Sequence, residues 1–177
     1  MYDMSRLFHI GIRVPDLDAA MHEIGTTMGV TWASVQNDPR STWVPGLGQV
    51  DIPVRLTYSV EGPVHYELLE GAPGTIRDGT VNPGPHHYGV WSDDVKGDTE
   101  RLLAQGWTLE LAAVSPEEGY GRLTYVRSPA GFLLEPVSSA AKPRFERWWA
   151  GGSLRDPGPA PSRGRVAQTI TTGSTTA

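Results

Sequence analysis

The chain has 177 residues, and its 15 Lys and Arg against 20 Asp and Glu give a formal net charge of −5. This acidic balance, without a Lys/Arg run, argues against nucleic acid or an anionic membrane as a partner. The lack of cysteine excludes a disulfide framework, a thiolate metal site and a cysteine nucleophile. A hydrophobic content of 38% with 20% charged residues is typical of a globular protein rather than a disordered chain.

The first apolar run covers residues 7–10, and only six residues precede it. We therefore expect no secretory signal there. No apolar stretch approaches the ~18 residues that a membrane span needs. We therefore expect a soluble cytoplasmic protein.

The first predicted element is a strand over residues 7–14. Its side chains alternate between two faces, with Phe8, Ile10, Ile12 and Val14 on one and His9, Gly11 and Arg13 on the other. This period of two is typical of a strand with unlike faces. The apolar face suits packing under a helix, and Gly11 leaves room on the other face for a ligand or a close backbone approach.

A helix is predicted next, capped by Asp16 or Asp18 and ending at Gly29. Residues 36–50, which are rich in Pro, Gly and Asn, predict a loop and a poorly defined strand. Strands over 55–60 and 64–70 then form a hairpin.

The second half of the chain repeats the first. His87 and Gly89 match His9 and Gly11, 78 residues later, and the run Arg-Leu-Thr-Tyr at 55–58 recurs at 122–125. A helix starting at Asp93-Asp94 follows the second His motif, and strands over 122–127 and 131–137 form the second hairpin. Because the matches occur in the same order, they indicate a duplicated module.

Each copy reads strand, helix, then three strands, which predicts an α+β fold of two tandem βαβββ modules, residues 1–75 and 76–140. We expect them to form a cup-shaped mixed sheet with the helices outside. Residues 141–150 predict a short C-terminal helix. Residues 151–177 contain no aromatic side chain and few Leu, Ile or Val, which predicts a flexible tail.

The repeat also places chemistry-bearing side chains at equivalent positions. His9 and His87 lie on the first strand of each copy, and Glu67 and Glu135 lie on the last. If the modules face each other about a pseudo-twofold axis, two imidazoles and two carboxylates converge, which suits a divalent first-row metal. The alternative is four unrelated residues, each His hydrogen-bonded within its strand and each Glu solvated. His87 is preferred to His86 because it matches His9 by repeat and by face.

Four runs, "FHIGIRVPDLDAAM", "HYELLEG", "YGVWSDDV" and "YVRSPAGFLLEPV", resemble the vicinal-oxygen-chelate superfamily over residues 6–138. This group includes glyoxalase I, methylmalonyl-CoA epimerase, extradiol dioxygenases and bleomycin- and fosfomycin-resistance proteins. The resemblance implies one divalent ion (Ni, Zn, Co, Mn or Fe) held by His9, Glu67, His87 and Glu135. That ligand order is the one found in bacterial-type glyoxalase I.

The resemblance further implies an isomerase, epimerase or lyase that moves a proton beside a metal-chelated carbonyl of a small molecule. Glu135, or Glu67 when displaced from the metal, is the expected base. His65 shares a strand face with Glu67. It is either a further acid or base, or a surface residue at the rim of the cup. Two other readings stay open: an Fe(II) ring-cleaving dioxygenase, and a non-catalytic small-molecule-binding or resistance protein.

Two more side chains are candidates for substrate binding. Arg13, on the face of His9, is placed to meet an anionic substrate group or to extend outward along the surface. Trp91, on the face of His87, either lines the cavity or fills the cup. The aromatic residues of 142–149 predict packing against the body of the protein or against a second subunit, and the family often forms homodimers.

Overall fold

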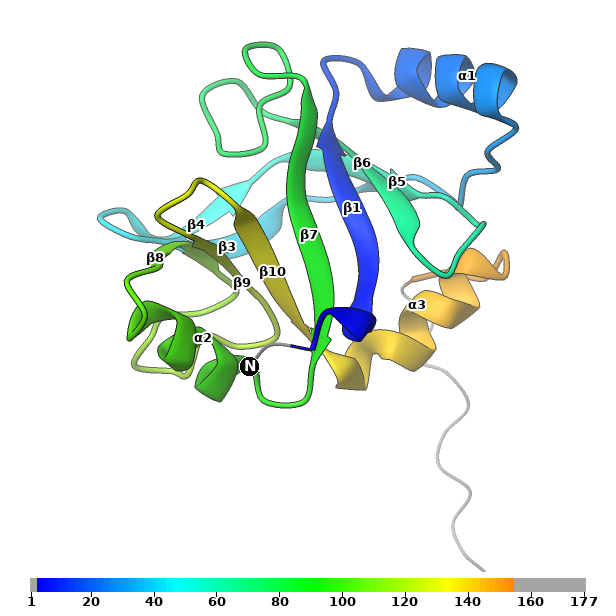
Figure 1. Ribbon diagram of the computed structural model, residues 1–177. Coiled ribbons are helices and arrows are strands. Elements are labelled where there is room, and N and C mark those ends of the chain that lie inside the picture. The colour runs from blue at the N-terminus through cyan, green and yellow to red at the C-terminus, as the bar shows by residue number, and fades with distance from the viewer. Residues whose placement is uncertain (1–2, 155–177) are drawn as a thin grey trace, which may run out of the picture.

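The computed structural model describes residues 3–154, which form one curled mixed sheet of ten strands with three α-helices (Figure 1). The strands are β1 (Leu7–Arg13), β2 (Gln36–Asn37), β3 (Arg40–Val44), β4 (Gly48–Ile52), β5 (Val54–Tyr58), β6 (His65–Gly71), β7 (Gly84–Ser92), β8 (Thr108–Ala112), β9 (Thr124–Arg127) and β10 (Leu133–Ser138). The helices are α1 (Leu17–Met28), α2 (Val95–Leu103) and α3 (Lys142–Trp149), with short 3-10 turns at Met4–Arg6 and Ser139–Ala141. The predicted α+β fold with a cup-shaped mixed sheet is confirmed.

The two copies meet at the centre of the sheet, whose strand order is β2-β5-β6-β1-β7-β10-β9-β8-β3-β4. The first strand of each copy runs parallel to the last strand of the same copy, β1 beside β6 and β7 beside β10. The antiparallel pairing of β1 with β7 joins the copies. This arrangement sets the four strands that carry the candidate metal ligands side by side.

The first copy is longer because it contains an extra hairpin, β3 with β4. Glu67 lies 58 residues after His9, whereas Glu135 lies only 48 residues after His87. Strand β2 forms one edge of the sheet, and the hairpin forms the other edge, where it lies beside β8 of the second copy (Figure 1). The pairing of β3 with β8 joins Trp43 and Ala112. The sequence predicted a loop and one weak strand here. The pairing of β3 with β8 joins segments that are distant in the sequence, so it leaves no local signal.

Helices α1 and α2 begin at the aspartates that the sequence indicated. Asp16 Oδ1 accepts a hydrogen bond from the Ala19 amide at 2.9 Å, and Asp94 Oδ1 accepts one from the Gly97 amide at 2.9 Å. Such caps satisfy amide groups that have no partner within the helix. The end of α1 also follows the prediction, because Gly29 adopts φ 71°, which favours glycine.

Each of these two helices covers the sheet through one apolar face. Leu17 of α1 is fully buried and packs in a cluster with Val14 and Leu68. On the second copy, Leu102 of α2 packs in a cluster with Val90 and Val126. The equivalent helices of the two copies are thus held by equivalent apolar clusters.

Helix α3 packs on the side of the sheet that carries the histidines. Trp148 is fully buried, and its Nε1 donates to the carbonyl oxygen of Ser34 at 3.0 Å and to its Oγ at 2.9 Å. Its ring also meets Tyr58 edge-on at 5.3 Å. Within residues 3–154 the predicted packing of this segment is therefore against the body of the protein.

Phe8 packs under a helix, 6.0 Å from the Phe145 ring of α3, but on the opposite face of the sheet from the one expected. The register between β1 and β7 shifts between Leu7 and His9, and this irregularity turns Phe8 to the inner side. There its ring stacks on Trp91 at 3.7 Å and lies in the same apolar cluster as Trp148. A strictly alternating strand has no bulge, so alternation alone predicts that Phe8 lies on the opposite side of the sheet.

The predicted tail falls mostly outside the described residues. Residues 151–154 are described, and Leu154 is buried in the cluster that contains Trp148; residues 155–177 lie outside the structure's described part. None of the helices in residues 3–154 combines the length and apolar character needed to cross a membrane.

Candidate metal centre

His9 and His87 come from the two central strands and are fully buried. In the β1–β7 ladder His9 lies opposite Gly89, and His87 lies opposite Gly11. The Nε2 atoms of the two imidazoles are 2.9 Å apart. The two rings therefore point at one place between the strands.

The two carboxylates reach the same place from the flanking strands. Glu67 of β6 lies beside Gly11 of β1, and Glu135 of β10 lies beside Gly89 of β7. Glu135 Oε2 is 3.0 Å from His9 Nε2, and Glu67 Oε2 is 3.0 Å from His87 Nε2. The remaining two nitrogen–oxygen distances, 3.4 Å from His9 to Glu67 and 3.3 Å from His87 to Glu135, are only slightly longer.

This geometry fits a divalent metal ion. The four ligand atoms all lie within 4.8 Å of one another. Nitrogen and oxygen ligands about 2.1 Å from a metal are roughly 3.0 Å apart at right angles and about 3.4 Å apart in a tetrahedron. Glu67 Oε2 is buried and makes no well-directed hydrogen bond among residues 3–154, although the Nε2 atoms of His87 and His9 lie 3.0 and 3.4 Å away. A buried carboxylate oxygen without such a bond is costly unless a cation faces it.

His9 and the two carboxylates favour one another's charged forms. Burial disfavours an imidazolium at His9, but Glu135 and Glu67 outweigh this and raise the pKa of His9 to about 9. Burial also opposes the charge on Glu135, yet His87 and His9 lower its pKa to about 2. The pKa of Glu67 is lowered by the same two imidazoles against its burial. In the metal-free protein the carboxylates thus hold a cation in this place, here a proton on His9.

His86 and His87 have different surroundings. The Nδ1 atoms of the two rings are 3.1 Å apart, so the far side of the His87 ring faces His86, whereas its Nε2 faces the carboxylates. Burial, followed by the nearby charge of His87, lowers the pKa of His86 to about 2. A neutral His86 is able to accept a hydrogen bond from His87 Nδ1, which leaves His87 Nε2 as the ligand atom.

The structure does not bring His65, Arg13 or Trp91 to this centre. His65 Nδ1 is 2.7 Å from the Ser59 carbonyl oxygen, and its ring stacks on Trp149 at 3.7 Å. Arg13 Nη1 donates to the carbonyl oxygen of Ile76 at 3.4 Å. Trp91 is buried against Phe8. The cavity beside the carboxylates is lined by none of the three.

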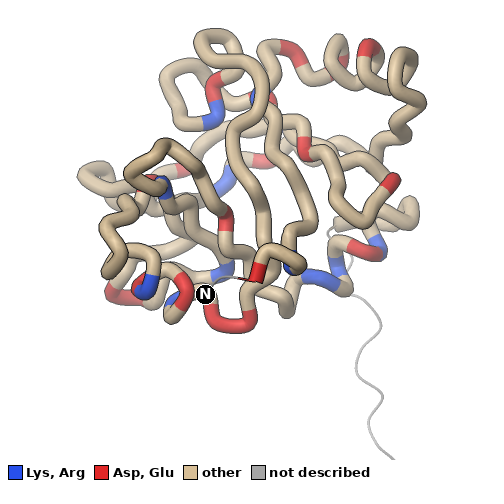
Figure 2. Tube along the Cα trace, viewed as in Figure 1, with Lys and Arg blue, Asp and Glu red and all other residues tan. Residues whose placement is uncertain are grey.

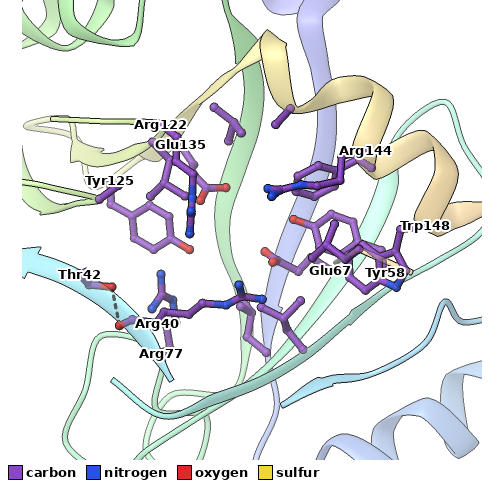
Figure 3. Close-up of a pocket in the computed structure, with 18 of the residues that line it drawn as sticks. Arg40, Thr42, Tyr58, Glu67, Arg77, Arg122, Tyr125, Glu135, Arg144 and Trp148 are labelled. Carbon is purple, nitrogen blue, oxygen red and sulfur yellow. Dashed lines mark hydrogen bonds between the residues drawn. The ribbon is translucent and has the colours of Figure 1, made fainter. Parts of the chain in front are cut away.

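A cavity of about 90 Å³ adjoins Glu67 and Glu135 (Figure 3). Tyr58 and Tyr125 line it on opposite sides, and each packs on one histidine, Tyr58 at 5.2 Å from His9 and Tyr125 at 4.7 Å from His87. Burial raises the pKa of both phenols, so both hydroxyls stay protonated.

These cavity residues were missed from the sequence, although a signal was present. Tyr58 and Tyr125 close the repeated Arg-Leu-Thr-Tyr runs, so they occupy equivalent positions of the two copies. Four arginines also line the cavity: Arg40, Arg77, Arg122 and Arg144. They come from the inserted hairpin, two loops and α3, and no sequence pattern groups them.

Residues 8–125 match the Glyoxalase/Bleomycin resistance protein/Dioxygenase superfamily. The chain belongs to this superfamily. The resemblance to vicinal-oxygen-chelate proteins is thereby confirmed. The matched residues include His9, Glu67 and His87 of the candidate metal centre, and Glu135 lies beyond them.

Solved structures of the same fold are distant in sequence. A methylmalonyl-CoA epimerase variant from Streptomyces coelicolor, in complex with 2-nitronate-propionyl-CoA, is 22% identical, covers 77% of this chain and 95% of its own, and gives a TM-score of 0.52. Methylmalonyl-CoA epimerase from Mycobacterium tuberculosis is 19% identical over 78% and 92% of the two chains, also with a TM-score of 0.52. A hypothetical protein from Bacillus halodurans C-125 is 17% identical over 75% and 93%, with a TM-score of 0.53. A search of the curated proteins gave no match.

Proposed function

We propose that this protein is a metal-dependent enzyme of the isomerase or lyase type, which transfers a proton beside a metal-bound carbonyl of a small molecule. The observation that carries the proposal is the convergence of two imidazoles and two carboxylates beside a cavity. His9, Glu67, His87 and Glu135 would hold one divalent ion, whose identity among Ni, Zn, Co, Mn and Fe is open. When bound, the ion supplies a Lewis acid that makes a neighbouring C–H bond more acidic.

The proton-transfer step falls to a carboxylate of this chain. Glu67 and Glu135 both border the cavity, so either oxygen pair is within reach of a substrate there. One of them accepts the proton from the substrate carbon and returns it to the product. The hydroxyl groups of Tyr58 and Tyr125 stay protonated beside the cavity and are available to donate hydrogen bonds to a substrate oxygen.

The direct test follows exchange of the substrate's proton in D₂O by NMR. Methylmalonyl-CoA is the first compound to examine because epimerases of that thioester share the fold, followed by small 2-hydroxy and 2-oxo carbonyl compounds. We expect metal-dependent deuterium incorporation into one of them. Replacing Glu135 or Glu67 by Gln keeps an oxygen for the metal but removes the base, so one of these variants is expected to retain metal and lose exchange.

Glu110→Gln is the matched control, because Glu110 pairs with Arg127 away from the cavity. It is expected to exchange at the wild-type rate. Oxygen consumption with an iron-loaded protein, without exchange, would instead favour the dioxygenase reading. A metal-loaded protein that binds compounds but exchanges none of their protons would favour a binding protein.

A further inference from the structure

The cavity beside the carboxylates continues into a more open cavity of about 580 Å³. The two share five lining residues, of which three are arginines: Arg40, Arg122 and Arg144. The inner cavity, at about 90 Å³, is much the smaller of the two. A larger substrate must therefore leave most of its atoms in the outer cavity, next to these guanidinium groups.

The arginines surround the inner cavity, with Arg40 and Arg77 on one side and Arg122 and Arg144 on the other (Figure 3). Arg77 lines the inner cavity and is only 5% exposed, with its guanidinium carbon 5.3 Å from the centre of the Tyr125 ring. Burial and then the like charges of Arg122 and Arg77 lower the pKa of Arg40, and partial desolvation and Arg144 lower the pKa of Arg122. Arg40 and Arg122 are thus each close enough to a neighbouring guanidinium for its charge to lower their pKa.

Within the described residues these cations lack the carboxylate ion pairs of other arginines, although Tyr125, Glu135 and Glu67 raise the pKa of Arg77 against its burial. Within residues 3–154, Arg40, Arg77, Arg122 and Arg144 form no ion pair with a carboxylate. Nε and Nη1 of Arg77 and Nε of Arg144 are buried and have no hydrogen-bond partner in that part of the chain. The repeat offers a comparison, because Arg55, at the position equivalent to Arg122, pairs with both Asp18 and Glu70.

Glu67 and Glu135 offset part of the repulsion among these guanidinium groups, and an anion bound between them would offset more of it. The cluster is local, because basic and acidic positions are mixed over the rest of the described chain, with a basic stretch at α3 (Figure 2). Planar guanidinium groups pair with carboxylates and phosphates through two parallel hydrogen bonds.

We propose that the substrate carries an oxyanion group, a carboxylate or a phosphate, which Arg40, Arg122 and Arg144 bind at the entrance of the cavity. Arg77 extends this site inward, toward Glu135. This inference rests on the proposed function, because it takes the small-molecule site to be the cavity beside the metal centre. It adds that recognition of the anionic group is separate from the metal, and that the inserted β3–β4 hairpin contributes to it through Arg40.

The test is isothermal titration calorimetry with two probes, inorganic phosphate and succinate, on both the metal-loaded and the metal-free protein. We expect at least one probe to bind the wild-type protein in both states, and the tighter probe identifies the group. The variants Arg40→Gln and Arg122→Gln are expected to weaken that binding by about tenfold or more, because each removes charge-assisted hydrogen bonds. Arg40→Lys, which keeps the charge but not the fork, is expected to bind with intermediate affinity.

Arg101→Gln is the matched control, since Arg101 lies on α2 and pairs with Asp98. Metal content and thermal unfolding are measured for every variant, and Arg122 is exposed enough that its replacement is expected to leave folding intact. Absence of binding by either probe to the folded wild-type protein, or equal binding by the Gln variants, would overturn the inference. The proposed function would fail separately from this inference. In that case the wild-type protein would bind no metal, while its metal-free form would still bind the anionic probe.

Discussion

Gly89 makes room for the ring of His9 across the central strand pair. A Cβ atom at Gly89 would lie 1.8 Å from His9 Cε1, and one at Gly11 would lie 2.0 Å from His87 Cε1. Each copy of the repeat thus provides the space that the histidine of the other copy occupies. The space that the glycine pattern indicated on this face is filled by the opposite histidine.

Gly89→Ala is therefore expected to displace the His9 imidazole and to weaken metal binding by about tenfold or more, the scale on which misplaced ligand rings act. The affinity is measured by competition with a metal-sensitive chelator. Gly11→Ala is expected to act in the same way through His87. Wild-type metal affinity in both variants, with unchanged circular dichroism, would show that the rings do not need this space.

His86→Phe tests the contact on the far side of the second ligand. Without His86, the buried Nδ1 of His87 loses its neighbour at 3.1 Å, and the ring is less well oriented. We expect metal affinity to fall by roughly 10-fold to 100-fold, as for other partners of metal-bound imidazoles. His22→Phe, at an exposed position of α1, serves as the control. The prediction fails if both variants bind metal equally well.

The stability of the metal-free protein is expected to depend on pH through His9. Its folded-state pKa of about 9 lies above the unfolded value near 6.5, so the proton bound between Glu135 and Glu67 stabilises the fold below about pH 6.5. That contribution, about 3 kcal/mol, is lost as the pH rises from 6.5 through 9. Urea denaturation of the metal-free wild type at a series of pH values measures it. A His9→Gln variant is expected to lack this loss; an equal loss in that variant would assign it elsewhere.

Helix α3 is expected to depend on Trp148 for its attachment. The side chain is fully buried and its indole N–H is shared between two oxygens of Ser34, so Trp148→Ala should lower the free energy of unfolding by about 3 to 5 kcal/mol. Trp148→Phe keeps most of the apolar contact and should cost less. Chemical denaturation checks both values. Alanine and phenylalanine variants of equal, near wild-type stability would be inconsistent with this packing.

The repeat allowed much of the fold and the centre to be predicted. His9 and His87, with Glu67 and Glu135, were picked out because equivalent positions of a duplicated module converge when its copies pair, and the structure brings all four together. Their role as metal ligands stays a prediction.

Features that break the repeat could not be predicted in this way. The β3–β4 hairpin occurs in one copy only, and its pairing with β8 is long-range. Phe8 faces inward because of a bulge that the alternation of residues does not reveal. Arg40, Arg77 and Arg144 meet at the cavity from segments far apart in the sequence, so only the folded chain groups them. Arg13 and Trp91 share strand faces with the histidines, but their side chains end in other contacts.

The metal content of the untagged protein, measured by mass spectrometry beside His9→Ala and Glu135→Ala, tests the central claim most directly. We predict close to one divalent ion per chain in the wild type and a clear loss in both variants, with unchanged content in the exposed-site variant His22→Ala. Wild-type protein that stays free of metal after reconstitution with each candidate ion, or variants that keep the full content, would contradict the account.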